Sequence, residues 1–244
     1  MTNHQRRMKR PKLIVALDVA TGYEAISLCE SLLPDVDFFK VGLRLFCAEG
    51  PRVINDIKSL GGLVFLDLKF HDIPAQVKQA SGVIGSYGVD MATVHCLGGP
   101  EMLAAAKAGF REGAQSVGTE PPLVVGVTIL TSLEPDDLEA VGVDSQIEIE
   151  VGVLAGLAKD AGLDGVVASP REIVGIKSEF TGDFLIVTPG IRPSWALPSA
   201  DQKRVMTPAE AVAAGASYIV VGRPITAATD PREAALKVLG EMGL

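Results

Sequence analysis

The stretch Leu63-Val64-Phe65-Leu66-Asp67-Leu68-Lys69 is a nearly continuous apolar run that ends in charged residues. An amphipathic segment follows it over Ala75 to Gly88, and a second apolar run follows over Asp90 to His95. Strands of a parallel sheet have this composition because both of their faces are covered, and a helix carries the chain from one such strand to the next. The stretch therefore predicts a strand, a helix and a second strand parallel to the first.

The same alternation extends along the whole chain. The strand candidates are Leu13 to Asp18, Phe38 to Gly42, Leu63 to Lys69, Asp90 to His95, Leu123 to Thr128, Gly165 to Ser169, Phe184 to Pro189 and Tyr218 to Gly222. The helix candidates are Tyr23 to Leu33, Pro51 to Leu60, Ala75 to Gly88, Met102 to Gly113, Ile147 to Ala161, Ser169 to Lys177, Thr207 to Ala214 and Pro231 to Leu239. Eight strand–helix units in 244 residues predict an α/β fold, a single (β/α)8 barrel of the TIM type.

An open doubly wound sheet is the alternative fold. It is disfavoured because the turn Asp18 to Gly22 has no Gly-x-Gly-x-x-Gly pattern, and no phosphate-binding Gly-Lys-Ser/Thr loop occurs in the chain. We expect residues 13–244 to form one catalytic barrel domain after a basic tail at residues 1–12. Two longer stretches, Ile129 to Asp144 and Gly190 to Arg204, are expected to be irregular loops of the kind that close over a site.

The charge and composition of the chain exclude several kinds of partner. The formal net charge of −8 gives no general attraction for nucleic acid or an anionic membrane, and no apolar run is long enough to span a bilayer. The three cysteines and three histidines show no metal-ligand spacing. We therefore expect a cytoplasmic protein with small core cysteines, no metal, and no nucleic-acid or membrane partner.

Polar residues collect where the predicted strands end, which is the active-site end of barrel enzymes. Asp67 and Lys69 lie two residues apart and should share one face of their strand. Such a pair is either a structural ion pair or an ammonium group held ready to deliver a proton. Arg192 and Gly222-Arg223 follow the seventh and eighth strands, where barrels commonly bind phosphate.

Asp18 and Lys40 end the first strand and lie on the second. They can bind the hydroxyl groups of a sugar, or they can be ion-pair partners at strand ends. Together with the arginines they indicate a phosphorylated sugar derivative whose reacting atom reaches Lys69. The chain contains no recognisable cofactor motif, so no cofactor is expected.

Six motifs, in order along the chain, resemble those of the orotidine 5'-phosphate decarboxylase family. They are Ile14-Val15-Ala16-Leu17-Asp18, Lys40-Val41-Gly42, Asp67-Leu68-Lys69-Phe70-His71-Asp72-Ile73-Pro74, Val127-Thr128-Ile129-Leu130-Thr131-Ser132, Val187-Thr188-Pro189-Gly190-Ile191-Arg192 and Val220-Val221-Gly222-Arg223-Pro224-Ile225. The resemblance implies a cofactor-free decarboxylation of orotidine 5'-monophosphate to uridine 5'-monophosphate (UMP) and carbon dioxide. It also implies a homodimer with sites at the interface.

The resemblance further implies a role for each matching residue. Lys69 resembles the proton donor to C6 of the pyrimidine, Asp67 lies beside the departing carboxylate, and Lys40 completes the array. Asp72 would be contributed by the partner subunit. The substrate ligands implied are Asp18 and Lys40 for the ribose, Thr131 for the pyrimidine, Arg192, Gly222 and Arg223 for the phosphate, and Gln202 in the closing loop.

One departure from the family pattern is Ala75-Gln76, where relatives usually have Asn followed by Thr, so the resemblance supports no ligand contact at Gln76. Two rival functions stay open. One is a Mg²⁺-dependent sugar-phosphate enzyme, such as a hexulose-phosphate synthase or a keto-gulonate-phosphate decarboxylase, which shares Asp-x-Lys-x-x-Asp. The other is a phosphosugar-binding barrel without catalytic activity.

Overall fold

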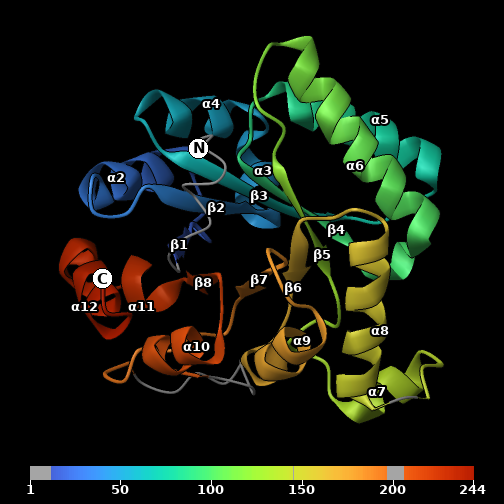
Figure 1. Ribbon diagram of the computed structural model, residues 1–244. Helices are drawn as coiled ribbons and strands as arrows, with labels where there is room; N and C mark the ends of the chain where they lie inside the picture. Colours follow the sequence, from blue (N-terminus) through green and yellow to red (C-terminus); the bar gives the residue numbers. More distant parts are fainter. Residues whose placement is uncertain (1–11, 145, 197–205) are drawn as a thin grey trace.

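A computed structural model describes residues 12–144, 146–196 and 206–244. In this part of the chain eight parallel strands form a closed barrel in sequence order, and β1 pairs with β8 to close it (Figure 1). The predicted (β/α)8 barrel is confirmed. The strands are β1 (Lys12–Ala16), β2 (Phe38–Gly42), β3 (Leu63–Phe70), β4 (Met91–His95), β5 (Leu123–Val127), β6 (Gly165–Val167), β7 (Leu185–Thr188) and β8 (Tyr218–Val221).

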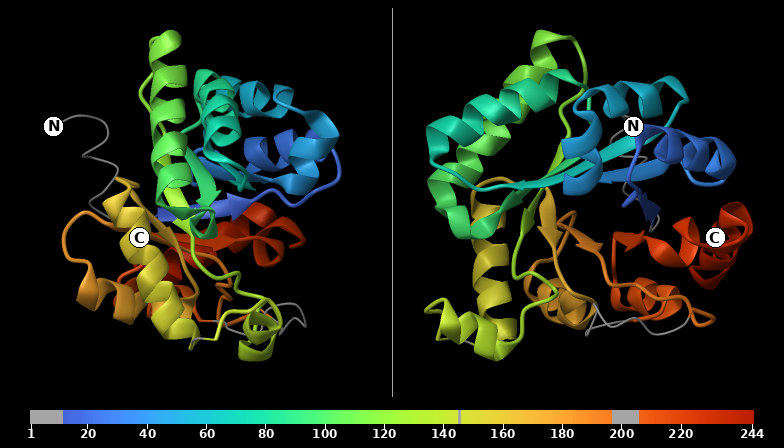
Figure 2. Two further views of the ribbon diagram at one scale, coloured as in Figure 1. Left: turned by 90° about the vertical axis from the view of Figure 1, so that its right-hand side faces the viewer. Right: turned by 180° about the vertical axis from the view of Figure 1, so that it is seen from behind.

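Helices surround the strands on the outside of the barrel (Figure 2). They are α2 (Gly22–Leu32), α3 (Leu43–Glu49), α4 (Arg52–Ser59), α5 (Pro74–Ser86), α6 (Gly99–Ser116), α7 (Pro135–Ala140), α8 (Ile147–Asp160), α9 (Ile173–Glu179), α10 (Pro208–Ala214), α11 (Arg223–Thr226) and α12 (Pro231–Glu241), with short 3₁₀ turns at Cys96–Gly98 and Pro170–Glu172. No helix in the described part of the chain is long and apolar enough to cross a bilayer.

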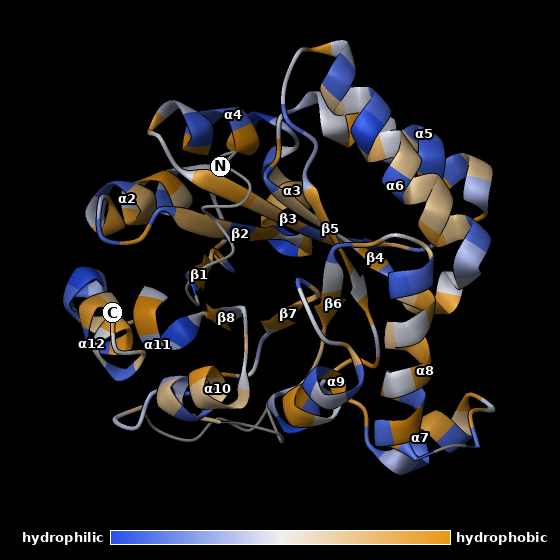
Figure 3. Cartoon of the chain, in the orientation of Figure 1, coloured by the Kyte–Doolittle hydropathy of each residue, from blue (hydrophilic) through white to orange (hydrophobic). Residues whose placement is uncertain are grey.

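Two layers of apolar side chains form the core. Alternate strand residues fill the barrel interior, among them Ile14, Phe65 and Met91, and the intervening ones pack against the helices. Because both faces are covered, the strands consist mainly of hydrophobic residues, whereas the surrounding helices carry many hydrophilic ones (Figure 3). This is why the strands read as continuous apolar runs in the sequence.

A recurring contact fixes the register at the amino-terminal end of the barrel. Asp90, Asp164 and Ser217 each precede an even-numbered strand. The side chain of each accepts a hydrogen bond from a backbone amide of the preceding strand, and its own amide donates to the carbonyl of that same residue. The three strand residues bonded in this way are Val64, Val124 and Ile186.

Several predicted boundaries differ from the structure. The stretch Ile129 to Asp144 is not wholly irregular, because α7 forms there; Pro135 begins this helix, and Glu134 and Asp137 cap it reciprocally. Strand β1 begins at Lys12, one residue inside the predicted tail. The prediction of core cysteines was wrong for Cys47, which is exposed on α3, a helix that the sequence analysis missed. The segment Ser169 to Lys177 forms a 3₁₀ turn followed by α9.

Candidate active site

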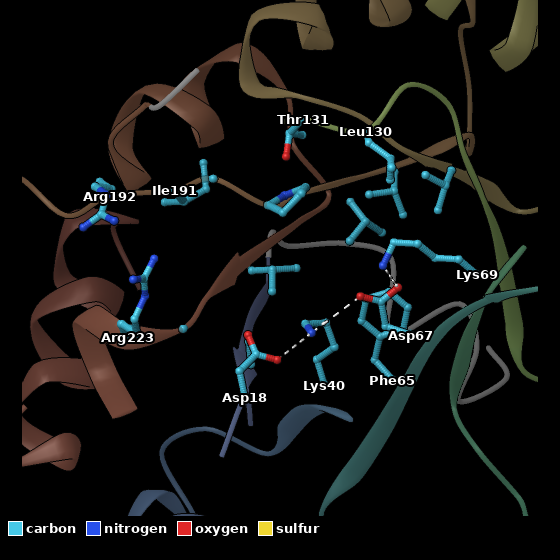
Figure 4. Close-up of a pocket in the computed structure, with 18 of the residues that line it drawn as sticks. Asp18, Lys40, Phe65, Asp67, Lys69, Leu130, Thr131, Ile191, Arg192 and Arg223 are labelled. Carbon is cyan, nitrogen blue, oxygen red and sulfur yellow. Dashed lines mark hydrogen bonds and ion pairs between the residues drawn. The ribbon is translucent and has the colours of Figure 1, made fainter. Parts of the chain in front are cut away.

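A cavity of about 450 Å³ opens at the carboxyl-terminal end of the barrel. Figure 4 shows Asp18, Lys40, Asp67 and Lys69 along one wall, with Arg192 and Arg223 across from Lys69 and Asp67. Apolar side chains complete the lining, among them Phe65, Val127, Ile129, Val167, Val187 and Ile191. The cavity therefore has a charged wall, a cationic corner and an apolar remainder.

The charged wall is a chain of alternating charges supplied by the first three strands and their ends. The Nζ of Lys40 lies 3.2 Å from Asp18 Oδ1 and 3.5 Å from Asp67 Oδ2. The Nζ of Lys69 lies 2.8 Å from the other oxygen of Asp67 (Figure 4). The Asp67 and Lys40 side chains are 14% and 12% exposed, so these charges interact with little screening by water.

Gly42, at the end of β2, leaves room for the first of these pairs. A Cβ atom there would lie 3.0 Å from the Lys40 Nζ and 3.3 Å from the Asp18 Oδ1. Any other residue would therefore press on the ion pair. The Lys40-Val41-Gly42 motif thus has a steric reason, since the glycine makes space for the charges on the preceding residues.

The backbone of β3 departs from a regular strand at Lys69. Lys69 has a φ of 53°, in the left-handed region that costs a non-glycine residue about 1–2 kcal/mol. The pairing with β4 is regular at Leu66 and resumes only at Phe70, so the register shifts between them. Simple alternation along a strand predicts that Asp67 and Lys69 share one face. Their side chains do meet, but the strand between them is distorted.

Thr93 on β4 is a polar residue that the sequence analysis missed. Its Oγ1 accepts a hydrogen bond from the Lys69 backbone amide at 2.8 Å and lies 3.1 Å from Asp67 Oδ1. The only signal in the sequence is a hydroxyl residue inside the apolar run of β4, and threonine is common in strands, so this signal does not single the residue out.

Two ionisable groups near the array have shifted pKa values. Burial alone would raise the pKa of Asp67, but the charges of Lys40 and Lys69 and hydrogen bonds from Lys69 and Thr93 lower it below its ordinary value. Asp67 is therefore ionised at neutral pH. Burial, with the charges of His71 and Lys69, lowers the pKa of His95, whose ring stacks on that of His71 at 5.3 Å between centroids.

The cationic corner is built from the segments that follow β7 and β8. Arg192 comes after Gly190, which has a φ of 77°, and its amide donates to Met206 O at 2.9 Å. Arg223 is the first residue of α11, and Gly222 precedes it as the N-cap. Both guanidinium groups reach the cavity (Figure 4). This end of the site can bind an anion with paired hydrogen bonds.

The structure brings most of the predicted site residues together in this one cavity: Asp18, Lys40, Asp67, Lys69, Thr131, Arg192, Gly222 and Arg223. Asp72 does not line it; its side chain is exposed and accepts a hydrogen bond from the Ile73 amide at 2.6 Å. Gln76 is exposed on α5 and also lies outside the lining. Gln202 lies outside the described residues. Within the described ranges, no group of three or more His, Cys, Asp or Glu side chains is placed to hold a metal ion.

A closed parallel barrel with its polar residues gathered at the carboxyl-terminal ends of the strands has the layout of a (β/α)8-barrel enzyme. Comparison with known proteins makes this assignment specific. The chain belongs to the orotidine 5'-phosphate decarboxylase / HUMPS family, whose model matches residues 11–238. The family predicted from the sequence motifs is confirmed.

Relatives that resemble the chain cover nearly all of it. It is 48% identical over 238 residues to the orotidine 5'-phosphate decarboxylase of Moorella thermoacetica, covering 97% of this chain and 94% of the relative. It is 52% identical over 233 residues to that of Syntrophotalea carbinolica, covering 96% and 95%. The crystal structure of orotidine 5'-phosphate decarboxylase from Lactobacillus acidophilus superposes with a TM-score of 0.86 at 38% identity, covering 97% of this chain and 100% of that one.

Proposed function

We propose that this chain catalyses the cofactor-free decarboxylation of orotidine 5'-monophosphate to UMP and carbon dioxide, as a cytoplasmic step of de novo pyrimidine biosynthesis. The observation that carries the proposal is the alternating array of Asp18, Lys40, Asp67 and Lys69 in one cavity with Arg192 and Arg223. The family membership and the names of the relatives support it.

The chemistry assigns the central step to Lys69. When the bond between C6 and the carboxylate breaks, carbon dioxide leaves and the electron pair stays on C6. In the proposed cofactor-free reaction no covalent electron sink takes up that pair, so a preorganised positive charge must stabilise it. In our proposal the Lys69 ammonium provides this charge and transfers its proton to C6. The neutral amine then regains a proton from solvent.

Asp67 raises the free energy of the bound substrate before the bond to carbon dioxide breaks. Its pKa is lowered, so it carries a negative charge at neutral pH beside the position proposed for the substrate carboxylate. Two like charges at close range repel, and the loss of carbon dioxide relieves the repulsion. Lys40 lies between Asp18 and Asp67, orients both carboxylates, and helps to keep Asp67 ionised.

The remaining ligands act at a distance from C6. We assign Arg192, Gly222 and Arg223 to the phosphate, Asp18 and Lys40 to the ribose, and Thr131 to the pyrimidine. Gln202 is assigned to a closing loop that bridges phosphate and base. Binding energy from these remote groups can be used to hold the ring against Lys69, which raises the rate as well as the affinity.

We further propose that the active protein is a homodimer and that the partner subunit's Asp72 completes each site. In one chain the Asp72 side chain is exposed and is not among the residues that line the cavity. The next residue, Ile73, is 62% exposed and Leu97 is 48% exposed, so both of these large apolar side chains are available for contact with a second subunit. A second subunit would cover these side chains and bring its Asp72 to the array.

The function is tested by adding the purified protein to orotidine 5'-monophosphate in the presence of EDTA. Ultraviolet absorbance follows the change from orotate to uracil, and carbon dioxide release provides an independent measurement. Conversion under these conditions supports the proposal and shows that no dissociable metal is needed. Lack of conversion by folded protein would contradict it, and turnover of sugar phosphates only with added Mg²⁺ would place the chain with the other activities of its family.

A further inference from the structure

Thr93 is a buried residue that contacts two members of the charged wall, Asp67 and Lys69. It lies on β4 two residues after Met91, so its side chain points into the barrel interior as that of Met91 does. The residue is only 1% exposed and does not line the cavity. Thr93 therefore cannot act on a bound ligand directly, and any effect on the reaction must pass through the residues that it contacts.

The register of β3 against β4 makes Thr93 the partner of the distorted segment. Leu66 pairs with Ala92 and Phe70 pairs with Val94, so Asp67, Leu68 and Lys69 all lie opposite Thr93 alone. The ordinary strand-to-strand ladder is interrupted there. The Lys69 backbone amide bonds to the Thr93 side chain at 2.8 Å instead.

The hydroxyl group of Thr93 has its direction fixed by its two neighbours. A backbone amide can only donate a hydrogen bond, and an ionised carboxylate can only accept one. The Thr93 Oγ1 therefore accepts from the Lys69 amide and donates its own hydrogen to Asp67 Oδ1, 3.1 Å away. That same carboxylate oxygen accepts from the Lys69 Nζ at 2.8 Å. The three groups form a closed loop of hydrogen bonds.

We propose that Thr93 is a positioning residue for the charged wall: its hydroxyl holds the left-handed backbone of Lys69 and the carboxylate of Asp67 in the relative placement that brings the Lys69 ammonium to its site of action. The kinetic part of this inference rests on the function proposed above. The structural part, that the hydroxyl couples these two residues, does not depend on the reaction.

The charged and hydrogen-bonding groups around Asp67 come from several elements. Lys40 faces it from β2, Lys69 from its own strand and Thr93 from β4; Asp18 lies beyond Lys40, and His95 with His71 lies near Lys69. The lysine charges are the main cause of the lowered pKa of Asp67, and the Thr93 hydrogen bond adds to them. Removing the hydroxyl should raise this pKa towards its ordinary value, because the ionised form loses a donor.

The test compares Thr93→Val, which removes the hydroxyl at nearly constant volume, with Thr93→Ser, which keeps it. For Thr93→Val we expect kcat to fall about ten- to a hundred-fold, as when a group that orients a catalytic residue is lost. UMP affinity should stay near that of the wild type, because the proposed phosphate and ribose ligands are untouched. The acid limb of the pH profile should move to higher pH. Thr93→Ser should restore both properties to within a few-fold.

The matched control is Thr128→Val. Thr128 is another fully buried threonine, and its Oγ1 donates to the backbone carbonyl of Val167 at 3.0 Å, away from the charged wall. This variant should lose some thermal stability without moving the acid limb. If Thr93→Val keeps the wild-type kcat and acid limb, or if it changes only in the way that Thr128→Val does, the positioning role is overturned.

A measurement without substrate separates this inference from the proposed function. The ¹³C signal of the Asp67 carboxyl group can be titrated in the full chain and assigned with Asp67→Asn. A higher pKa in Thr93→Val than in the wild type supports the coupling even if the protein fails to decarboxylate orotidine 5'-monophosphate, and an unchanged pKa contradicts it. Failure of the wild type to turn over that substrate overturns the proposed function alone.

Discussion

At the scale of single residues, the site contains features that reduce the stability of the folded protein and that an ordinary strand lacks. Lys69 combines a left-handed backbone with a charged side chain, and Asp67 and Lys40 are nearly removed from water. Such features persist only where the surrounding structure determines them strongly. Here the Thr93 hydroxyl and the mutual ion pairs fix the geometry. The strain is thus located at the residue to which we assign the chemistry.

Lys69→Ala should abolish turnover and leave nucleotide binding measurable. The variant loses the positive charge that stabilises the carbanion, and we expect kcat to fall at least about a thousand-fold. The phosphate and ribose ligands remain, so UMP should still bind in a calorimetric titration. Lys58→Ala is the control, since Lys58 pairs with Asp90 at 3.0 Å at the amino-terminal end of the barrel. Retained turnover in Lys69→Ala would refute its role as proton donor.

The lowered pKa of Asp67 predicts a pH-dependent contribution to stability. The folded state holds this carboxylate ionised more strongly than the unfolded state does, so the contribution is fully present above the unfolded pKa of about 3.9. It is lost as the pH falls through the lower, folded-state pKa. The difference in unfolding free energy between wild type and Asp67→Asn should therefore shrink in urea titrations below about pH 4. A difference that does not vary with pH would contradict this.

At the scale of elements, the strands were the most predictable features. Each predicted strand matches an observed one within two residues, because covered parallel strands are apolar on both faces. Thr207 and Gly215 cap the two ends of α10, which agrees closely with the predicted helix Thr207 to Ala214. Short helices such as α3 and α7 were missed, since a helix of one or two turns shows too little periodicity.

For the charged wall, the sequence predicted which residues take part but not the backbone geometry that positions them. The motifs place Asp18, Lys40, Asp67 and Lys69 at strand ends, and the barrel brings them together. The bulge at Lys69 and its bond to Thr93 could not be predicted, because an ideal strand already puts Asp67 and Lys69 on one face. The sequence is compatible both with a regular strand and with a strand that bulges at Lys69. Only the observed pairing of β3 with β4 distinguishes the two.

The packing of α5 against α6 depends on glycine. A Cβ atom at Gly113 would collide with the backbone carbonyl of Gly82, and one at Gly109 with that of Lys78. Gly113→Ala should therefore destabilise the protein by about 1–3 kcal/mol. Gly175→Ala is the matched control, because Gly175 lies in α9 with open space around it. It should stabilise by up to about 1 kcal/mol through helix propensity.

Thermal and urea unfolding of both variants measure this difference. Equal effects of Gly113→Ala and Gly175→Ala would contradict this prediction. They would show that α5 and α6 can move apart at Gly113 without a loss of stability.

At the scale of the whole molecule, the proposed dimer makes a complementation experiment possible. In a hybrid of Lys69→Ala and Asp72→Ala chains, one site carries both lesions and the other carries neither. Random reassociation makes about half of the dimers hybrid, each with one intact site of two, so mixing should restore about a quarter of wild-type turnover.

The control for this mixture pairs Lys69→Ala with Lys40→Ala. Both residues belong to the same chain's site, since they contact Asp67 within one subunit. Every site in that hybrid keeps one lesion, and activity should not return. No recovery with the first mixture, after subunit exchange has been verified, would refute the assignment of Asp72 to the neighbouring site.

Because β1 pairs with β8, residues from opposite ends of the chain meet in one site. The charged wall comes from the part of the chain that ends at β3, whereas the arginines of the cationic corner follow β7 and β8. In our proposal the first half of the chain therefore supplies the reacting groups together with the ribose ligands, and the second half supplies the ligands of the pyrimidine and the phosphate. The proposed phosphate ligands thus lie far along the chain from the reacting groups, so substitutions that change which anion is bound can arise without altering the residues assigned to the reaction.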